Sequence, residues 1–126
     1  MDKEDLKKKL SEEEFHITQE KGTERPFHNI YWDKKDDGLY TCKVCGAKLF
    51  LSSRKYDSGT GWPSFDDAIT GAVKYHEDID RGMSRVEVVC TNCGAHLGHV
   101  FEDGPSDTTG KRFCMNSASL SFEKQE

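Results

Sequence analysis

Apolar residues recur at two different periods, which divide the chain into a helical beginning and a strand-rich remainder. Over residues 2–20 two leucines lie four positions apart, the spacing of one helix face. Ser11 is followed three residues later by Glu14, the pattern of a capping box, so a second short helix is predicted to begin there. We expect this helix to end at Gly22, because glycine readily adopts the left-handed backbone of a helix C-terminus.

Short apolar runs separated by turns fill the rest of the chain. Phe113 and Met115 alternate with Cys114 and Asn116, so the thiol and the amide are expected to share one face of a strand. The predicted strands lie at residues 39–42, 47–51, 73–76, 85–90, 98–101, 113–116 and 120–122. Short strands with frequent Gly, Asp and Ser turns are typical of a mainly β, antiparallel domain.

Length and composition predict a single small domain that needs a metal ion or disulfides for stability. A chain of 126 residues corresponds to one domain, residues 1–126. Hydrophobic residues make up 34% of the chain and charged residues 33%, so the core is expected to be modest. Small domains with modest cores are commonly stabilised by a metal ion or by disulfides.

Charge and hydropathy exclude several classes of partner. The net charge of −5 argues against a nucleic-acid-binding face, which would be basic. No apolar run is long enough to predict a membrane span, and residues 1–5 lack the apolar centre of a secretory signal. We therefore expect a cytoplasmic monomer in a reducing compartment, where paired cysteines bind metal more often than they form disulfides.

Four of the five cysteines form two Cys-x-x-Cys pairs, Cys42 with Cys45 and Cys90 with Cys93. Both pairs continue as Gly-Ala-x-Leu, so the chain contains an internal repeat. Four thiolates in two tight turns suit one tetrahedral structural Zn²⁺, which leaves no coordination position open for catalysis. Two alternatives are a pair of disulfides and a redox-active Cys-x-x-Cys. A redox pair usually lies at a helix start, whereas these pairs lie between predicted strands.

Cys114 is the remaining cysteine and the candidate nucleophile. A lone cysteine is most often a small buried core residue. Here Arg112 and Asn116 lie on the same predicted strand face. A guanidinium favours the nucleophilic thiolate over the thiol, and the amide of Asn116 can both donate and accept hydrogen bonds.

A second candidate cluster contains His96, His99 and Asp103. A histidine can deliver a proton near neutral pH, and Asp103 could hold one imidazole in the correct tautomer. The alternatives are zinc ligation and an ordinary surface position. Ligation is disfavoured because four thiolates already complete the metal shell.

A third cluster is the glycine-rich stretch 56–65, which contains Trp62 and Phe65. Two interpretations stay open: the aromatic side chains anchor the loop in the core, or they form the wall of an apolar substrate pocket. The long loops at 57–71 and 102–111 are where functional residues are commonly found.

Taken together, these motifs resemble those of the methionine-R-sulfoxide reductases of the B type. The resemblance covers nearly the whole chain. It includes both cysteine pairs and residues 22–27, 58–65, 94–101 and 112–117. It implies a fold of antiparallel sheets with short N-terminal helices, and a structural zinc held by the two cysteine pairs.

The resemblance also implies roles for the candidate residues. Cys114 attacks the sulfoxide sulfur, while His99, with His96 and Asn116 nearby, binds and protonates the sulfoxide oxygen. Trp62 packs on the methyl group of the substrate.

Two further roles concern the charged residues: Arg112 supports the thiolate and Asp103 orients a histidine. The substrates implied are oxidised proteins or peptides that contain methionine-R-sulfoxide, which the enzyme would repair. The product on Cys114 is a sulfenic acid, which condenses with thiols.

Position 60 departs from a common pattern of this family. Many members carry a resolving cysteine where this chain has Thr60, two residues before Trp62. We therefore expect an external reductant, a thioredoxin-like protein or a small thiol, to attack the sulfenic acid.

Two rival hypotheses remain. A non-enzymatic zinc-knuckle module would use Trp62 and Phe65 as a protein-binding face and would bury Cys114 unreactively. A nucleic-acid-binding zinc ribbon is disfavoured by the acidic net charge and by the absence of a Lys/Arg cluster.

Overall fold

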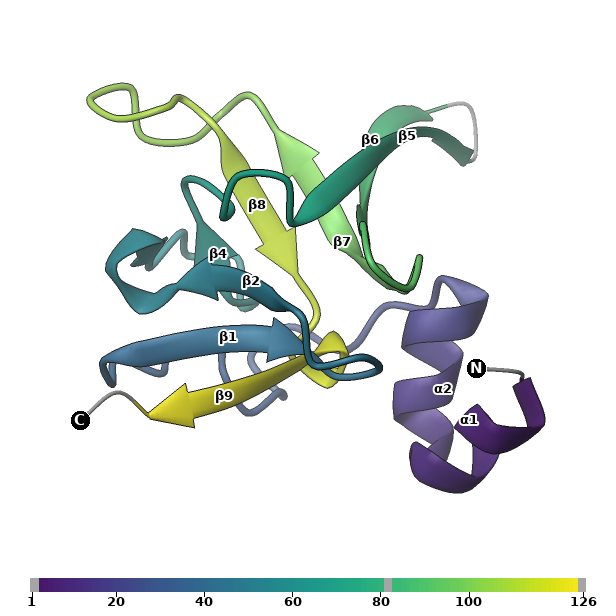
Figure 1. Ribbon diagram of the computed structural model, residues 1–126. Helices are drawn as coiled ribbons and strands as arrows, with labels where there is room; N and C mark the ends of the chain where they lie inside the picture. The colour runs from purple at the N-terminus through teal and green to yellow at the C-terminus, as the bar shows by residue number, and fades with distance from the viewer. Residues whose placement is uncertain (1–2, 81–82, 125–126) are drawn as a thin grey trace.

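Two short helices lie side by side at one end of a β body in the computed structural model, which describes residues 3–80 and 83–124 (Figure 1). They are α1 (Lys3–Lys9) and α2 (Glu12–Glu20). The capping box is confirmed, because the Ser11 hydroxyl accepts from the Glu14 backbone N–H and the Glu14 carboxylate accepts from that of Ser11. The left-handed residue after α2 is Lys21 (φ 57°), one position before the predicted Gly22.

The β body consists of two antiparallel sheets, which confirms the predicted fold class. The smaller sheet has the order β2-β1-β9 and the larger one β3-β4-β8-β7-β6-β5. The strands of the smaller sheet are β1 (Gly38–Cys42), β2 (Lys48–Leu51) and β9 (Leu120–Lys124). Those of the larger sheet are β3 (Lys55–Tyr56), β4 (Ser64–Phe65), β5 (Val73–Asp80), β6 (Met83–Cys90), β7 (His96–Phe101) and β8 (Arg112–Met115).

Several strand boundaries differ from the prediction. Strand β5 continues to Asp80, four residues beyond the predicted end, because it pairs with β6 along its whole length. Strand β7 begins at His96, two residues before the predicted start. The two-residue strands β3 and β4 lie in a stretch for which no strand was predicted. Strand β3 pairs with β4, and β4 pairs with β8, so this stretch forms one edge of the larger sheet.

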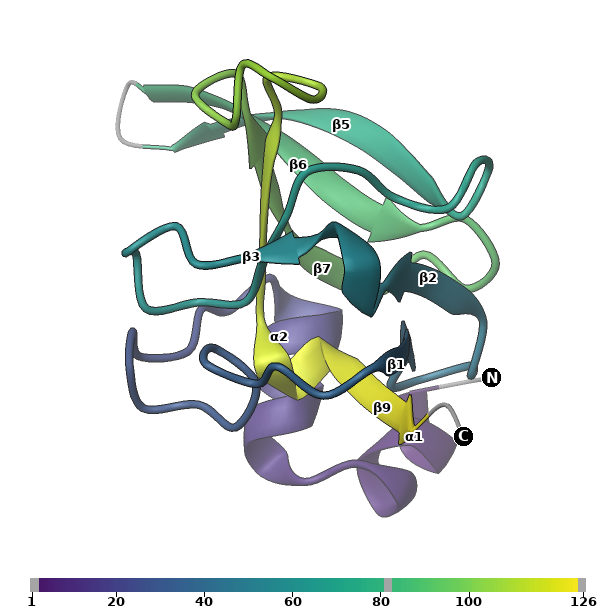
Figure 2. The same cartoon turned by 90° about the vertical axis from the view of Figure 1, so that its left-hand side faces the viewer.

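Short 3-10 helices complete the chain. One of them, η1, spans Ser52–Arg54, and the other, η2, spans Ser117–Ser119. The second connects β8 of the larger sheet directly to β9 of the smaller sheet (Figure 2). Among the described residues, no helix is long and apolar enough to cross a membrane.

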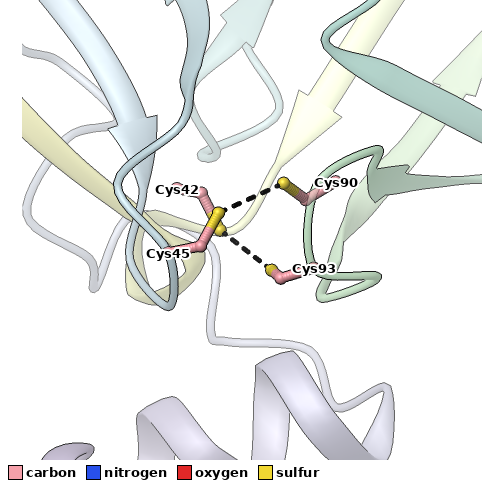
Figure 3. Close-up of side chains that lie close together, drawn as sticks. All are labelled: Cys42, Cys45, Cys90 and Cys93. Carbon is pink, nitrogen blue, oxygen red and sulfur yellow. Dashed lines mark hydrogen bonds between the residues drawn. The ribbon is translucent and has the colours of Figure 1, made fainter. Parts of the chain in front are cut away.

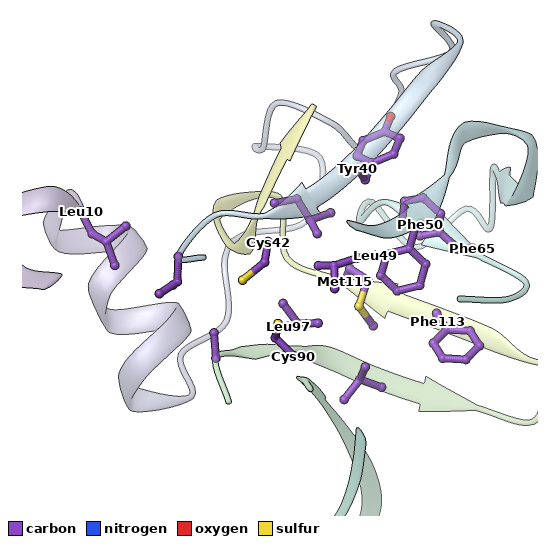
Figure 4. Packing of buried hydrophobic residues seen from close by; sticks show 14 of the residues in the cluster. Leu10, Tyr40, Cys42, Leu49, Phe50, Phe65, Cys90, Leu97, Phe113 and Met115 are labelled. Atoms are coloured by element: carbon purple, nitrogen blue, oxygen red, sulfur yellow. The ribbon is translucent and has the colours of Figure 1, made fainter. Parts of the chain in front are cut away.

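The core lies between the two sheets and is rich in aromatic side chains (Figure 4). The rings of Phe50 and Phe65 are stacked, with centroids 4.3 Å apart. Tyr40 contacts Phe65 edge-on at 5.1 Å, and Phe113 contacts Phe50 at 5.8 Å. All four side chains are fully buried, so this cluster joins β1, β2, β4 and β8.

The helices are attached to the turn between β1 and β2. Leu6 and Leu10 belong to the buried core cluster together with Val44 of this turn. Lys9 donates from Nζ to the carbonyl oxygen of Val44 at 2.6 Å. Apolar burial and this hydrogen bond therefore fix the N-terminal helices beside the first cysteine pair.

Candidate active site and metal centre

The two cysteine pairs meet at one point between the sheets (Figure 3). The turn between β1 and β2 carries Cys42 and Cys45, and the turn between β6 and β7 carries Cys90 and Cys93. The sulfurs of Cys42 and Cys93 are 3.6 Å apart, as are those of Cys45 and Cys90, and all four lie within 4.8 Å of one another. A disulfide requires about 2.05 Å between sulfurs, so these four thiols are free.

This arrangement fits one tetrahedral zinc ion. Zn–S bonds of about 2.3 Å place tetrahedral sulfur ligands about 3.8 Å apart, close to the separations found here. The four thiols are thus a possible zinc site, with a donor set that zinc prefers.

The internal repeat corresponds to two matching turns. Gly46 and Gly94 have φ values of +79° and +78°, a conformation that favours glycine. Their backbone N–H groups donate to the carbonyl oxygens of Cys42 and Cys90, each at 2.8 Å. The repeated Cys-x-x-Cys-Gly pattern therefore specifies a turn that presents two sulfurs to one point.

A cavity of about 240 Å³ opens on the larger sheet and contains most of the predicted site residues. Its lining consists of Thr23, Thr60, Trp62, Arg85, Gly98, His99, Phe101, Arg112, Cys114, Met115 and Asn116. A larger hollow of about 420 Å³ beside Trp32 and Lys55 is lined by neither cysteine nor histidine, so it lacks a nucleophile of that kind. The cavity over β8 is therefore the candidate active site.

Strand pairing brings residues that are distant in sequence to Cys114. On one side β7 places His99 opposite Cys114, and on the other β4 places Ser64 opposite it. The close approach of β7 to β8 requires glycine at position 98, because a Cβ there would lie 2.1 Å from the carbonyl oxygen of Cys114. The sheet thus sets the distance between nucleophile and imidazole.

Burial and local charge act on Cys114 in opposite directions. Burial raises the pKa of the Cys114 thiol, whereas the Arg112 guanidinium and a hydrogen bond with Thr60 lower it. The effect of burial is larger, so the pKa of Cys114 lies above its ordinary value. The predicted influence of Arg112 is present, but it does not by itself produce a thiolate in the free protein.

Asp103 contacts Arg112, whereas the prediction paired it with an imidazole. Its carboxylate accepts from Nε of Arg112 at 2.8 Å and from Nη2 at 3.2 Å. This pairing lowers the pKa of Asp103 and raises that of Arg112. The guanidinium carbon also lies 4.4 Å from the ring centroid of Phe101. Two contacts therefore fix the side chain that faces Cys114.

The two histidines are held by carboxylates that were not predicted. Nε2 of His99 lies 2.9 Å from Oδ2 of Asp78, and Nδ1 of His96 lies 2.7 Å from Oε2 of Glu87. Glu87 could have been suspected as a lone acid between valines in a buried strand. Asp78 lies in the polar stretch 76–78, and no sequence signal separates it from a surface residue.

The histidines differ in their access to the cavity. Among the described residues, His99 lines the cavity and His96 does not. His96 is 2% exposed, and burial lowers its pKa although Glu87 acts in the opposite direction. The ring centroids are 5.4 Å apart. The arrangement makes His99 the imidazole that a bound molecule can reach.

Trp62 and Asn116 are both attached to Glu24, another residue without a predicted role. The backbone carbonyl of Glu24 accepts from Nε1 of Trp62 at 3.0 Å, and its N–H donates to Oδ1 of Asn116 at 3.3 Å. Its buried carboxylate accepts from the backbone N–H groups of Ser117 and Ala118. The segment that contains Glu24 therefore joins two sides of the cavity.

Phe65 does not take part in the cavity. Its side chain is 0% exposed and stacks on Phe50 in the core. The structure therefore places Phe65, predicted to bind substrate, in the core, whereas Trp62 lines the cavity. Of the two open interpretations, Phe65 anchors the loop and Trp62 forms part of the pocket wall.

Comparison with known proteins identifies the family. The model of the SelR domain matches residues 10–124. The chain belongs to the SelR family. A relative from Methanosarcina mazei, named peptide methionine sulfoxide reductase MsrB, is 54% identical over 98% of this chain and 88% of its own length.

Two other relatives of this family bear the same kind of name. An Acinetobacter baumannii protein named peptide methionine sulfoxide reductase MsrB is 56% identical over 94% of this chain and 86% of its own length. Methionine-R-sulfoxide reductase B3, mitochondrial, from Mus musculus is 55% identical over 94% of this chain, which spans 47% of the mouse protein. This SelR-family chain is accordingly an oxidoreductase of the methionine-R-sulfoxide reductase B type.

One solved structure resembles the fold at low sequence identity. The Mis18 'Yippee-like' domain superposes with a TM-score of 0.58 over 72% of this chain and 99% of that domain. The two sequences are 16% identical, so this likeness concerns the fold alone.

Proposed function

We propose that this chain reduces methionine-R-sulfoxide in oxidised proteins or peptides through a sulfenic acid on Cys114, and that an external thiol regenerates the enzyme. The observation that carries the proposal is the cavity in which Cys114 lies opposite His99 in the sheet, beside Trp62 and Asn116. Membership of the SelR family supplies the reaction class.

Cys114 is the nucleophile in this proposal. Its sulfur attacks the sulfoxide sulfur, while His99 delivers a proton to the sulfoxide oxygen, which departs poorly without one. The S–S bond formed by this attack and the S–O bond of the substrate then break as the oxygen passes to Cys114. The substrate sulfur gains two electrons, the Cys114 sulfur loses two, and the products are methionine and a sulfenic acid.

Trp62 and Asn116 position the substrate. The indole offers an apolar surface for the methyl group, and its N–H is already bound by the carbonyl of Glu24. Asn116 lines the cavity beside Cys114, and its amide can interact with the sulfoxide oxygen. Arg112, fixed by Asp103, stabilises the negative charge of the attacking sulfur.

His96 has a supporting part in this scheme. It is buried next to His99 and donates from Nδ1 to the carboxylate of Glu87, so it supports the position of His99 rather than reaching the substrate. The structural zinc at Cys42, Cys45, Cys90 and Cys93 fixes the turn that precedes β7.

Regeneration needs thiols from outside the cavity. Thr60 lines the cavity together with Cys114 and has no thiol to offer. The first external thiol attacks the sulfenic sulfur and releases water, which leaves a mixed disulfide on Cys114. A second thiol then forms the oxidised reductant and frees Cys114. A thioredoxin-like protein or a small thiol can serve in both steps.

Stereospecific turnover tests the proposal. With excess dithiothreitol, we expect reduction of a peptide that contains methionine-R-sulfoxide and at least about 100-fold slower reduction of the S epimer. Cys114→Ser should lose turnover while it keeps its zinc and its fold. Full turnover by Cys114→Ser, or equal rates with both epimers, would refute the proposal.

A further inference from the structure

A small charged cluster contacts the two histidines of β7 from the neighbouring strands β5 and β6 and from the end of α2. It consists of Lys21, which follows α2, Asp78 of β5 and Glu87 of β6. The ammonium of Lys21 is 3.3 Å from Oδ1 of Asp78 and 3.4 Å from Oε1 of Glu87. One lysine therefore bridges two carboxylates from neighbouring strands.

Each carboxylate uses its other oxygen for a histidine. Oδ2 of Asp78 contacts Nε2 of His99 at 2.9 Å, and Oε2 of Glu87 contacts Nδ1 of His96 at 2.7 Å. Glu87 is 5% exposed, and the side chain of Asp78 is 13% exposed. Two nearly buried carboxylates are held in the same way, between a shared ammonium and one imidazole each.

We propose that Asp78 and Glu87 are the positioning residues of the histidine pair, and that Lys21 sets the charge of this cluster. This inference rests on the proposed function, in which His99 is the general acid, because it concerns the residues that hold His99. Asp78 occupies Nε2 of His99, which leaves Nδ1 as the nitrogen that can exchange a proton with the substrate.

The electrostatic effect of the cluster has a definite sign. A carboxylate beside an imidazole stabilises the protonated form, which is the form that a general acid needs. Lys21 acts in the opposite direction on the pKa of His96, but it also pairs with both carboxylates and holds them in place. The pKa of Asp78 is lowered first by its hydrogen bond to His99 and next by Lys21, in agreement with this geometry.

Other charged groups also contact the two carboxylates. Nδ1 of His76 lies 3.8 Å from Oε1 of Glu87, and Nη2 of Arg85 lies 3.5 Å from Oδ2 of Asp78. On the cavity side, Arg112 and Cys114 face the histidines from β8. Lys21 differs from these groups because it contacts both carboxylates.

Two substitutions in the zinc-loaded enzyme test the proposal, because one removes a negative charge and the other removes a positive charge. Asp78→Asn removes a negative charge beside His99, so kcat should fall about 10- to 100-fold, with KM within about twofold. The alkaline limb of kcat/KM should move to lower pH, and Asp78→Glu should restore part of kcat. Lys21→Met removes a positive charge, so the alkaline limb should move to higher pH.

A neighbouring carboxylate provides the control. Glu77 lies next to Asp78 on β5, is exposed, and contacts only the hydroxyl of Ser84 among the described polar groups, at 3.5 Å. Glu77→Gln should leave both kcat and the pH profile unchanged. A purely structural role for the cluster predicts lower stability in both variants and no opposite movement of the pH profile.

The outcomes separate the two proposals. If the wild-type enzyme does not reduce a peptide methionine-R-sulfoxide, the proposed function fails. If the wild type is active but Asp78→Asn and Lys21→Met have the pH profile of Glu77→Gln, the positioning role is overturned. Should Asp78→Asn not fold, the direction of the shift in Lys21→Met decides, since a shift to lower pH or no shift contradicts the proposal.

Discussion

Cys114 combines burial of its thiol with neighbouring groups that favour its ionised form. Its side chain is partly buried in a cavity with Trp62 and Met115, surroundings that suit a methyl thioether and disfavour a thiolate. Arg112 and Thr60 offset part of that cost. Burial therefore raises the pKa of the Cys114 thiol, although groups that stabilise its ionised form lie close by.

Alkylation kinetics should report this balance. Because burial raises the pKa of Cys114, its modification by iodoacetamide should increase with pH and reach half of its limiting rate above about pH 8.5. Arg112→Gln removes a charge that lowers the pKa, so the midpoint should move higher still. Mass spectrometry of the peptide that contains Cys114 measures the rate separately from the zinc cysteines. A midpoint near pH 7 in the wild type would contradict this account.

Single residues also show where sequence reasoning succeeded and where it failed. Alternation along one strand correctly grouped Arg112, Cys114 and Asn116 at one cavity. Asp103 was assigned to a histidine because the two are close in sequence, but the loop after β7 returns it to Arg112. Asp78 reaches His99 across strands, through a pairing that spacing along one chain does not reveal.

At the scale of elements, the two cysteine turns act as a clamp between the sheets. One turn belongs to the smaller sheet and the other to the larger, and the helices pack against the first (Figures 1 and 3). The cluster of four thiols could be predicted because a Cys-x-x-Cys-Gly turn is a local structure with a local sequence pattern. The strands β3 and β4 could not, because two residues form a strand only through partners elsewhere.

Loss of one ligand should therefore weaken the whole domain. Structural zinc contributes about 10–16 kcal/mol to small zinc domains, as much as the net stability of a typical protein, about 5–15 kcal/mol. We expect Cys45→Ser to bind clearly less than one zinc per chain and to melt at least about 10 °C lower. Zinc analysis and calorimetry measure both effects.

Cys114→Ser is the matched control for the zinc prediction. It removes a sulfur that lies outside the four-thiol cluster, so it should retain one zinc per chain and a Tm close to that of the wild type. Equal zinc content and equal Tm for Cys45→Ser and the wild type would show that the cluster has no structural role.

At the scale of the whole molecule, the aromatic core fixes the distance between the sheets and thereby supports the cavity. Phe65 lies on β4, whose other residue, Ser64, pairs with Cys114. The Phe50–Phe65 stack consequently joins the smaller sheet to the strand beside Cys114. Sequence composition predicted a modest core, but which aromatic residue would fill it and which would face substrate depended on the tertiary fold.

The two aromatic residues of the loop should have different effects when substituted: Phe65 mainly on stability, and Trp62 mainly on substrate binding. Phe65→Ala leaves a cavity in the core and should cost about 3–5 kcal/mol in urea unfolding. Trp62→Phe loses the indole hydrogen bond to Glu24 and should cost about 1 kcal/mol, while it raises KM for the sulfoxide. If Phe65→Ala leaves stability unchanged, the assignment of Phe65 to the core is incorrect.

A single turnover without reductant tests the central claim most directly, namely that Cys114 reacts with the sulfoxide while the other four cysteines hold zinc. After one equivalent of peptide methionine-R-sulfoxide, trapping with dimedone and mass spectrometry should find the sulfenic acid on Cys114, with one zinc still bound. Thr60→Cys is the positive control for resolution, since a thiol beside Cys114 should give an intramolecular disulfide instead. In the wild type, a disulfide between Cys114 and any of the four zinc-site cysteines, accompanied by zinc release, would contradict the account.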